Sequence, residues 1–375
     1  MLESSPLLES THGMISWWEP QVGTAERLMI QQVLDGQFLN DGAVTAEFEQ
    51  VLAEQLGSRY VVSVTSGTMA LFVALKAVGV GPGDEVIVPD LTFIATANAV
   101  MLCGATPVAV DIEPDRLMMD PDGVEAAITS RTRAIVPVHI SGRAAKMAEL
   151  MDLAQRHELL VVEDAAEAFL SRTNGRALGS IGHCGCFSFS PMKMVQTGQG
   201  GAIATDDPEI HRKLILLKDQ GRPMRGTGGD DLHECVGFNF KFTNLQAAVG
   251  LAQMNHVQDR LDRVRRHYEI YRSELEAIEE VRVLPFDLNT GECPLWVDCL
   301  AQQRDALIAA LEKQYIDCRP FWHPLHRQAP YRREAGDFPV SAELSQRAMW
   351  LPSAYTLEDE QIQCVCDAIR GFYAR

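Results

Sequence analysis

The stretch YVVSVTSGTMALFVALKAV, residues 60–78, decides the fold class of this chain. It begins with a short run rich in β-branched residues, Tyr60–Val64, which is typical of a buried strand. The turn TSGT follows at residues 65–68, and an apolar, helix-like segment occupies residues 69–78. A strand, a turn and a helix in this order form the first half of a crossover unit between two parallel strands.

The same alternation continues downstream. Further strand-like segments lie at residues 85–89, 107–111, 134–139 and 159–163, and helix-like segments lie at 94–103, 122–128 and 147–157. Two more helices are expected upstream, at residues 24–34 and 44–56. Short strands that alternate with longer helices predict an α/β fold with a mixed, mostly parallel sheet between helices.

The pattern changes beyond about residue 206. We expect helices at residues 208–217, 243–275 (long or broken), 303–314 and 358–372, with a strand at 295–300. This part predicts a smaller α+β domain. We therefore expect a loose N-terminal segment (residues 1–20), a large domain (residues 21–255) and a small C-terminal domain (residues 256–375).

Composition excludes several classes of protein. The 375 residues carry a formal net charge of −18, and 46% of them are hydrophobic, so a disordered chain is excluded. No run approaches the ~18 apolar residues that a membrane helix needs. The longest basic stretch is the short one at residues 263–266, which argues against nucleic acid as a partner.

The nine cysteines are scattered, and none of their spacings resembles a zinc site, so we expect no metal. The first five residues, MLESS, lack the basic start and apolar core of a signal peptide. We therefore expect a cytoplasmic protein with reduced thiols.

Ligands of open parallel sheets bind beyond the carboxyl ends of the strands, so candidate binding residues are expected in the loops that follow the strands. The loop at residues 65–68 offers a glycine, three hydroxyl residues and a helix N-terminus, which together suit a phosphate group. The same residues are also typical of an ordinary helix N-cap.

Two further loops carry charged residues in unusual places. Asp164 follows a buried strand, where it serves either as an N-cap or as a carboxylate that pairs with a cationic ring nitrogen of a cofactor. Lys193 lies between apolar residues and a glycine-rich turn at residues 197–201. A lysine in such a pocket can act as an amine nucleophile and base, although an isolated lysine more often only extends its amine to solvent.

In a fourth segment, residues 237–248, aromatic and polar side chains alternate. A half-buried strand has the same pattern, so this segment alone does not indicate a functional site. A phosphate cradle, a ring-nitrogen carboxylate and a lysine nucleophile, in that order along the chain, are the parts that a pyridoxal-phosphate enzyme needs. The four segments together are therefore far more specific than any one of them.

The chain closely resembles the sugar aminotransferases of the DegT/DnrJ/EryC1/StrS family, which have the fold of type I pyridoxal-phosphate enzymes. The resemblance runs from about Val22 to the last helix. Its most specific stretches are residues 65–71 (TSGTMAL), 89–99 (PDLTFIATANA), 138–142 (VHISG), 163–168, 187–201, 237–253 and 320–331 (PFWHPLHRQAPY).

The resemblance implies that Lys193 forms the Schiff base with pyridoxal 5′-phosphate and that Asp164 keeps the ring nitrogen protonated. Further cofactor contacts implied in the same way are Gly67, Thr68 and Ser188 at the phosphate, Phe93 stacked on the ring, Glu167 near the phenolic oxygen, and Asn239. In the family, that asparagine reaches the phosphate from the partner subunit. The resemblance thus implies a homodimer with shared active sites, with an aromatic-rich strand around Asn239 at the interface.

Two positions depart from the common family pattern. Glu167 stands where many members have Gln, although part of the family, including members similar to GDP-perosamine synthases, has Glu. Lys241 replaces the usual Arg, which keeps the charge and loses bidentate geometry. Lys193 itself is kept, whereas the dehydratase branch of the family has His there.

Four histidines are candidates by their position. His323, His326 and Lys241 are expected near the substrate on resemblance alone, and a structural role is the alternative for the two histidines. His139 is expected over the cofactor region, and His183 in a loop without a specific partner.

The resemblance implies a transaminase that moves an amino group from glutamate, or glutamine, to a keto-sugar in amino-sugar biosynthesis. A nucleotide-linked 4-keto-6-deoxysugar is the favoured acceptor. A C-3 keto-sugar, a keto-cyclitol and a keto-octulosonate remain alternatives. A catalytically silent regulator of the same fold is the alternative from another class.

Overall fold

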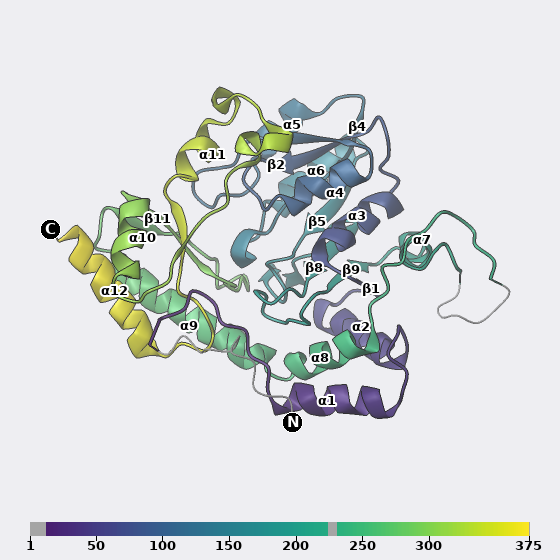
Figure 1. The fold of residues 1–375 in the computed structure, drawn as a ribbon. Coiled ribbons are helices and arrows are strands. Elements are labelled where there is room, and N and C mark those ends of the chain that lie inside the picture. The colour runs from purple at the N-terminus through teal and green to yellow at the C-terminus, as the bar shows by residue number, and fades with distance from the viewer. Residues whose placement is uncertain (1–12, 224–230, 375) are drawn as a thin grey trace.

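The structure, a computed structural model, describes residues 13–223 and 231–374. Within these residues a seven-stranded sheet has the order β1-β9-β8-β5-β4-β2-β3 (Figure 1). Its strands are β1 (Tyr60–Val64), β2 (Glu85–Pro89), β3 (Thr106–Val110), β4 (Thr132–Ile135), β5 (Leu160–Asp164), β8 (Cys184–Ser188) and β9 (Gly201–Thr205). Strand β9 is antiparallel to both neighbours, and the other pairs are parallel, which confirms the predicted mixed, mostly parallel sheet.

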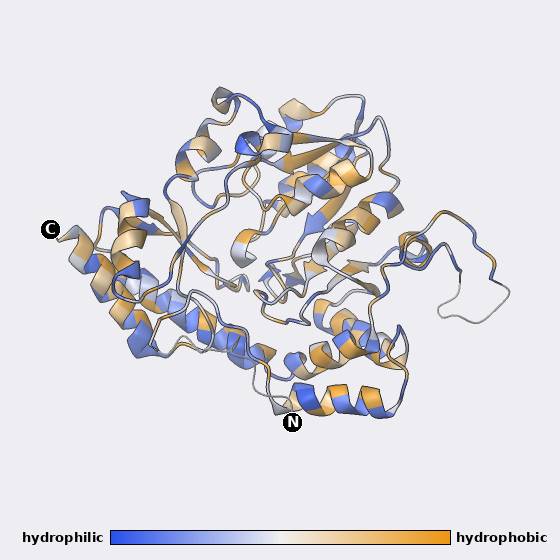
Figure 2. Cartoon of the chain, viewed as in Figure 1, coloured by the Kyte–Doolittle hydropathy of each residue, from blue (hydrophilic) through white to orange (hydrophobic). Residues whose placement is uncertain are grey.

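Helices cover both faces of this sheet. They are α2 (Ala43–Leu56), α3 (Gly67–Ala77), α4 (Ala95–Leu102), α5 (Pro121–Ala127), α6 (Met147–Arg156) and α7 (Pro208–Lys218). Two further helices, α1 (Thr24–Asp35) and α8 (Asn244–Met254), pack together outside this layer, with α8 against α2 (Figure 1). Successive residues of β2 illustrate the two buried faces, because Val86 and Val88 belong to one hydrophobic cluster and Ile87 belongs to another. Strands buried on both faces are rich in apolar residues, and Figure 2 shows hydrophobic colouring on the strand ribbon around β2.

A second, antiparallel sheet has the strand order β10-β11-β13-β12 among the described residues. Its elements and those around it are β10 (Val281–Val283), β11 (Val297–Ala301), β12 (Arg319–Pro320), β13 (Ala348–Leu351), α9 (Val257–Leu275), α10 (Arg304–Glu312), α11 (Pro339–Leu344) and α12 (Asp359–Tyr373). Short elements complete the chain: β6 (Arg172–Thr173), β7 (Arg176–Ala177) and the 3₁₀ turns Ile140–Gly142, Leu325–Arg327, Ala329–Tyr331 and Ala335–Asp337. Helices α9 and α12 lie side by side at the outer edge (Figure 1).

The predicted long helix is broken between Met254 and Val257, where α8 ends and α9 begins. Because α8 packs on α1 and α2 whereas α9 packs on α12, we propose residue 255 as the boundary between the two domains. The predicted loose segment differs from the structure over residues 13–20. Trp17 and Trp18 are buried there, and Ile15 pairs with Ile316; residues 1–12 lie outside the described residues.

Two segments fold differently from the prediction. The strand expected at residues 134–139 ends at Ile135, and beyond it Val138 forms only an isolated bridge with Asp164. The aromatic-rich segment around Asn239 is not a strand, because Asn239 and Lys241 form isolated bridges with Asp219 and Val64. Within the described part of the chain, no helix is both long and apolar enough to cross a bilayer.

Candidate active site

Lys193 lies in the loop that follows β8 and is enclosed by residues from both domains. Its Nζ is 3.3 Å from Oε1 of Glu167, in the loop after β5, and 4.7 Å from the centre of the Trp296 ring. The side chain is only 13% exposed. Because β5 and β8 are parallel neighbours, their carboxyl ends bring the loops of Lys193 and Glu167 together.

Asp164 ends β5 and is almost completely buried. Its Oδ2 accepts a hydrogen bond from the Thr96 hydroxyl (2.8 Å), and its Oδ1 accepts one from the Ala166 amide (3.2 Å). Burial raises the pKa of the Asp164 carboxyl, although these hydrogen bonds and the positive charge of Lys193 act in the opposite direction. The site therefore holds a carboxylate that a nearby cation would stabilise.

Glu167 is the second buried carboxylate. The Ser141 backbone N–H donates to its Oε2 (3.0 Å), while Oε1 faces Lys193. Burial raises the pKa of the Glu167 carboxyl, and the negative charges of Asp164 and Asp298 raise it further. The positive charge of Lys193 and the hydrogen bond from the Ser141 amide act in the opposite direction. One amine thus lies near two carboxyl groups whose pKa values burial raises, so that burial disfavours their charged forms.

Helix α3 begins at this edge of the sheet with Ser66 as its N-cap, whose hydroxyl accepts from the Met69 amide (3.2 Å). A Cβ placed on Gly67 would lie 2.8 Å from Cβ of Ser188, so only glycine lets the helix start so close to the end of β8. The first-turn amides of Gly67 and Thr68 and the Ser188 hydroxyl belong to this corner. This arrangement has the donor chemistry of a phosphate cradle.

Phe93 and Asn239 are exposed in the single chain. The Phe93 side chain is 54% exposed, and its ring centre lies 6.3 Å from that of Trp322. Asn239 lies on the segment between α7 and α8, close to Asp219. Lys241, two residues further on, forms an ion pair with Asp219 at 2.6 Å.

The four histidines have separate surroundings. His326 is buried, and its Nδ1 lies 2.7 Å from Oδ2 of Asp90, whereas His323 is exposed. The Nδ1 of His183 accepts the Val161 amide hydrogen at 3.0 Å, so this residue does have a partner.

His139 does not face the cofactor loops. Its Nε2 is 2.9 Å from Oε2 of Glu163, and its Nδ1 accepts the Ala145 amide hydrogen. Burial favours the protonated form of Glu163, yet the hydrogen bond with His139 and two loop amides leave its pKa below the ordinary value. His139 and Glu163 therefore form a buried pair within the large domain, away from the position expected from sequence.

Sequence reasoning missed three residues of the site. Thr96 lies within the stretch 89–99 that carried the family resemblance, so its place three residues after Phe93 was a usable signal. Ser141 lies within the stretch 138–142, which also carried the resemblance, so its position was a usable signal too. Trp296 gave none, because it meets Lys193 through a contact between segments far apart in the chain.

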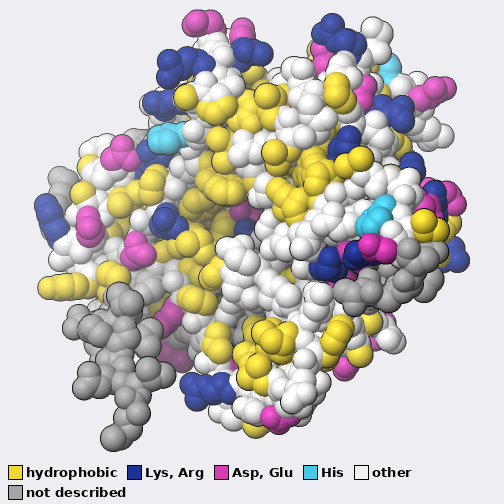
Figure 3. Space-filling view, turned by 45° about the vertical axis from the view of Figure 1, so that its right-hand side comes forward, with side chains coloured by type: hydrophobic (Ala, Val, Ile, Leu, Met, Phe, Trp, Pro, Cys, Tyr) yellow, Lys and Arg dark blue, Asp and Glu magenta, His cyan; other side chains and the backbone are white. Residues whose placement is uncertain are grey.

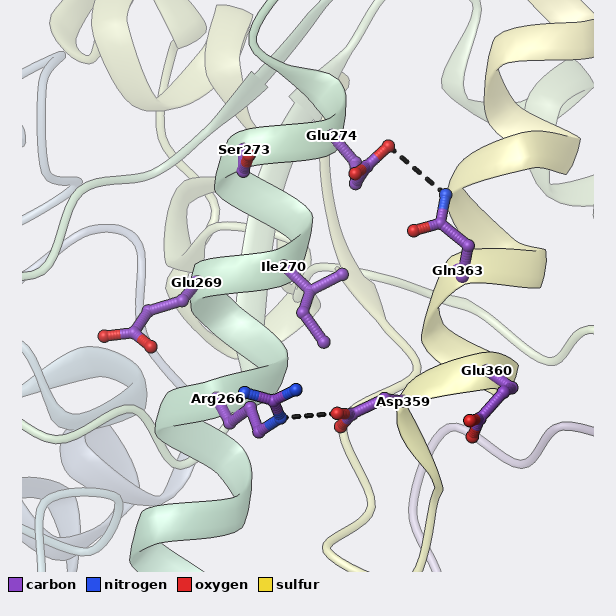
Figure 4. A pocket seen from close by; sticks show the side chains of 8 residues that line it. All are labelled: Arg266, Glu269, Ile270, Ser273, Glu274, Asp359, Glu360 and Gln363. Atoms are coloured by element: carbon purple, nitrogen blue, oxygen red, sulfur yellow. Dashed lines mark hydrogen bonds and ion pairs between the residues drawn. The ribbon is translucent and has the colours of Figure 1, made fainter.

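A hollow of about 470 Å³ between α9 and α12 shares no residue with this site. Figure 4 shows its polar lining, with Arg266 paired to Asp359 and Gln363 bonded to Glu274. Among residues 13–223 and 231–374, no group of three or more His, Cys, Asp and Glu side chains is arranged to hold a metal ion.

Comparison with known proteins decides the family. A profile of the DegT/DnrJ/EryC1/StrS aminotransferase family matches residues 20–370. The chain belongs to this family. It is 38% identical over 364 residues to the GDP-perosamine synthase of Caulobacter vibrioides, covering 95% of this chain and 97% of that one. It is 37% identical over 351 residues to a UDP-N-acetyl-3-dehydro-alpha-D-glucosamine 3-aminotransferase of Acidithiobacillus ferrooxidans, covering 91% and 92%.

Among solved structures, DesV of S. venezuelae, in complex with a ketimine intermediate, superposes with a TM-score of 0.89 at 34% identity, covering 93% of this chain and 94% of that one. The chain is thus a pyridoxal-phosphate-dependent transaminase. Its own residues fit that cofactor, because the glycine-lined corner at α3 suits a phosphate and the buried Asp164 suits a cationic ring nitrogen.

Proposed function

We propose that this aminotransferase moves the amino group of glutamate to the keto carbon of a nucleotide-linked 4-keto-6-deoxysugar in amino-sugar biosynthesis. The observation that carries the reaction class is the position of Lys193 beside two buried carboxylates at the carboxyl edge of the sheet. Pyridoxal phosphate supplies an electron sink that makes the hydrogen on the amino-bearing carbon of the donor acidic. The protein must supply the binding, the charge and the proton transfer.

Lys193 has the chemistry of both the covalent attachment point and the base. Its amine is screened from water by the Trp296 ring and by the small domain. As base and acid, this amine would move a proton from the α-carbon of glutamate to the cofactor in the first half-reaction, and from the cofactor to the sugar carbon that receives nitrogen in the second. Glu167 orients the amine between these two transfers.

Asp164 keeps a positive charge on the ring nitrogen. The Thr96 hydroxyl and the Ala166 amide fix the carboxylate in one orientation, so it does not need to reorganise during the reaction. A preorganised negative charge in a buried position is worth more than the same charge in water.

Four residues complete the binding of the cofactor in this proposal. Gly67, Thr68 and Ser188 hold the phosphate at the start of α3, where the helix dipole favours an anion. Phe93 offers an exposed aromatic face for the ring. A local anion site of this kind is needed in a chain whose net charge is −18.

The substrate class is supported by the relatives. Three proteins named GDP-perosamine synthase are 33–38% identical to this chain, which favours a 4-keto-6-deoxysugar linked to a nucleoside diphosphate. The relative named as a 3-aminotransferase keeps a C-3 keto-sugar as the second candidate. We place His323 and Lys241 near the sugar nucleotide, whereas the bond of buried His326 to Asp90 favours a role in joining the two domains.

We also propose a homodimer in which Asn239 completes the phosphate site of the partner subunit. Asn239 is exposed in the single chain and lies between α7 and α8, where it forms an isolated bridge with Asp219. Figure 3 shows hydrophobic side chains gathered across the middle of one face, with charged side chains around them. Large hydrophobic side chains that are more than half exposed include Phe93, Met101, Leu102 and Val236. Such surface is typical of a subunit interface.

The two half-reactions test the proposal separately. Addition of L-glutamate to the purified holoenzyme should abolish the visible absorbance band of the bound cofactor, and a silent regulator would keep it. The treated enzyme should then aminate one member of a panel of keto-sugar nucleotides, with ¹⁵N-glutamate as the source of the nitrogen seen by mass spectrometry. Amination at C-3 only, or of no keto-sugar, would contradict the proposed substrate.

A further inference from the structure

A buried chain of contacts leads from the active site into the small domain, and Ser141 lies at its centre. The Ser141 amide donates to Oε2 of Glu167 at 3.0 Å, and its hydroxyl donates to Oδ1 of Asp298 on β11 at 2.9 Å. Asp298 also forms an ion pair with Arg143. Ser141, Arg143 and Asp298 are completely buried. Two charged groups and one hydroxyl are thus enclosed directly behind a carboxylate that faces Lys193.

The backbone of Ser141 is held in an unfavourable conformation. Its φ is 53°, in the left-handed region that residues other than glycine rarely adopt. The conformation is fixed from the small domain, because the Leu295 amide donates to the Ser141 carbonyl at 2.8 Å. The next residue, Gly142, has φ 99° and approaches the Cys293 carbonyl so closely that a Cβ would lie 2.0 Å from it. Strain of this kind persists where the surroundings over-determine it and often marks a functional constraint.

From this geometry we infer that Ser141 is a positioning residue that ties Glu167 to the buried Arg143–Asp298 pair, so that the small domain sets how Glu167 faces Lys193. The inference rests on the proposed roles of Lys193 and Glu167. It adds a connection that neither carboxylate provides by itself, because Asp298 belongs to the small domain and Glu167 to the large one.

The charges around Glu167 make its orientation matter. The charged groups that face it are Lys193 from the loop after β8, Asp164 from β5 and Asp298 from β11. Of these three groups only Lys193 is cationic, and the charge of Asp298 is balanced by Arg143. A small movement of the carboxylate away from Lys193 and towards Asp164 would therefore weaken its interaction with the amine. The Ser141 amide fixes one oxygen, which leaves the other directed at the amine.

Ser171 provides a matched control. It is also completely buried and also joins the same two segments, since its hydroxyl donates to the Gly142 carbonyl (2.5 Å) and accepts from the Cys293 amide (3.0 Å). Among the described residues, its hydroxyl bonds only to these two segments, and not to Glu167 or Lys193. Loss of either hydroxyl should therefore weaken the contact between the domains. Only the loss at Ser141 should also change the protonation of the nitrogen at Lys193.

The test compares Ser141→Ala and Ser171→Ala as holoenzymes. In each, the cofactor absorbance is titrated with pH, which reports the protonation of the nitrogen at Lys193, and thermal unfolding is measured alongside. We expect both variants to unfold at lower temperature. Ser141→Ala should also move the absorbance midpoint to lower pH by about half a unit or more, because a less well-placed carboxylate stabilises the cation less. It should lower kcat more than it changes KM for glutamate.

An unchanged midpoint in Ser141→Ala, or an equal movement in Ser171→Ala, would overturn the inference and leave Ser141 with a purely structural role. Should Ser141→Ala not fold, Ser141→Gly replaces it, because glycine adopts the left-handed backbone without strain and still lacks the hydroxyl. Failure of the proposed function has a different signature, since the wild-type protein would then show no cofactor band that titrates.

Discussion

Replacement of Asp164 by Asn should have opposite effects on turnover and on the stability of the apoprotein. Asn keeps the shape and removes the charge. Its Oδ1 can still accept the Ala166 amide hydrogen, and its Nδ2 can donate to the Thr96 hydroxyl, which in turn can donate to Thr92. The neighbouring hydrogen bonds therefore survive, and the change reports the charge itself.

Turnover should fall in Asp164→Asn. A hydrogen bond to a charged group is worth ~1.5–3 kcal/mol, and each ~1.36 kcal/mol corresponds to a factor of ten in rate. The expected loss in kcat is therefore roughly 10- to 100-fold, with a smaller effect on cofactor occupancy. Steady-state rates with a saturating keto-sugar and direct measurement of bound cofactor distinguish the two effects.

The apoprotein should become more stable in the same variant. Because burial raises the pKa of Asp164 above its ordinary 3.8, this group favours folding below that pH, and the benefit is lost as pH rises through the raised value. Above the raised pKa the wild-type apoprotein carries a destabilising buried charge, and Asn removes it. We expect Asp164→Asn to gain stability relative to the wild type as pH rises, and this gain to shrink on acidification.

Asp207→Asn is the control, since Asp207 is an N-cap of α7 and Asn caps a helix equally well. This variant should change neither turnover nor stability. Denaturant unfolding of the apoproteins between acid and neutral pH gives the second quantity. Wild-type turnover in Asp164→Asn, or an apoprotein destabilised at every pH, would refute the reasoning.

Three other experiments test the remaining parts of the site. Thr96→Val removes the hydroxyl that orients this same carboxylate and should lower kcat by roughly 3- to 10-fold; unchanged kcat would remove Thr96 from the site. Gly67→Ala places a Cβ 2.8 Å from the side chain at the end of β8 and should weaken cofactor binding about tenfold or more, whereas Gly81→Ala, with open space around it, should not. Mixed Lys193→Ala and Asn239→Ala subunits, differently tagged to prove exchange, should exceed the activity of either parent; parental activity after exchange would contradict shared sites.

The elements that sequence located best are those whose side chains repeat with a clear period. Strands β1 and β2 begin and end where their β-branched runs do, because the large domain buries both faces of each. Strands β8 and β9 were missed, since glycine, serine and alanine make up much of them and gave the appearance of a loop. Their close packing needs those small residues: a Cβ on Gly185 would meet the Gly179 backbone at 1.8 Å.

The residues of the site also differ in how well the sequence located them. Lys193 could be located because it is an isolated charge between apolar residues and a glycine-rich turn, and Asp164 because it follows a predicted buried strand; both are local patterns. The surroundings of Ser141, Trp296 and His326 could not, because each contacts residues more than a hundred positions away. His139 was misplaced for a related reason, since Glu163 on the opposite side of β5 from Asp164 is its partner.

The central claim is that Lys193 carries the cofactor, and borohydride reduction tests it most directly. Reduction of the holoenzyme converts the carbon–nitrogen double bond between cofactor and lysine into a stable single bond, and peptide mapping by mass spectrometry then locates it. The amines of Lys218 and Lys241 already form ion pairs with Asp41 and Asp219, so we do not expect either amine to bind the cofactor. We predict that the cofactor is found on Lys193, and its recovery on Lys218 or Lys241 would contradict the account.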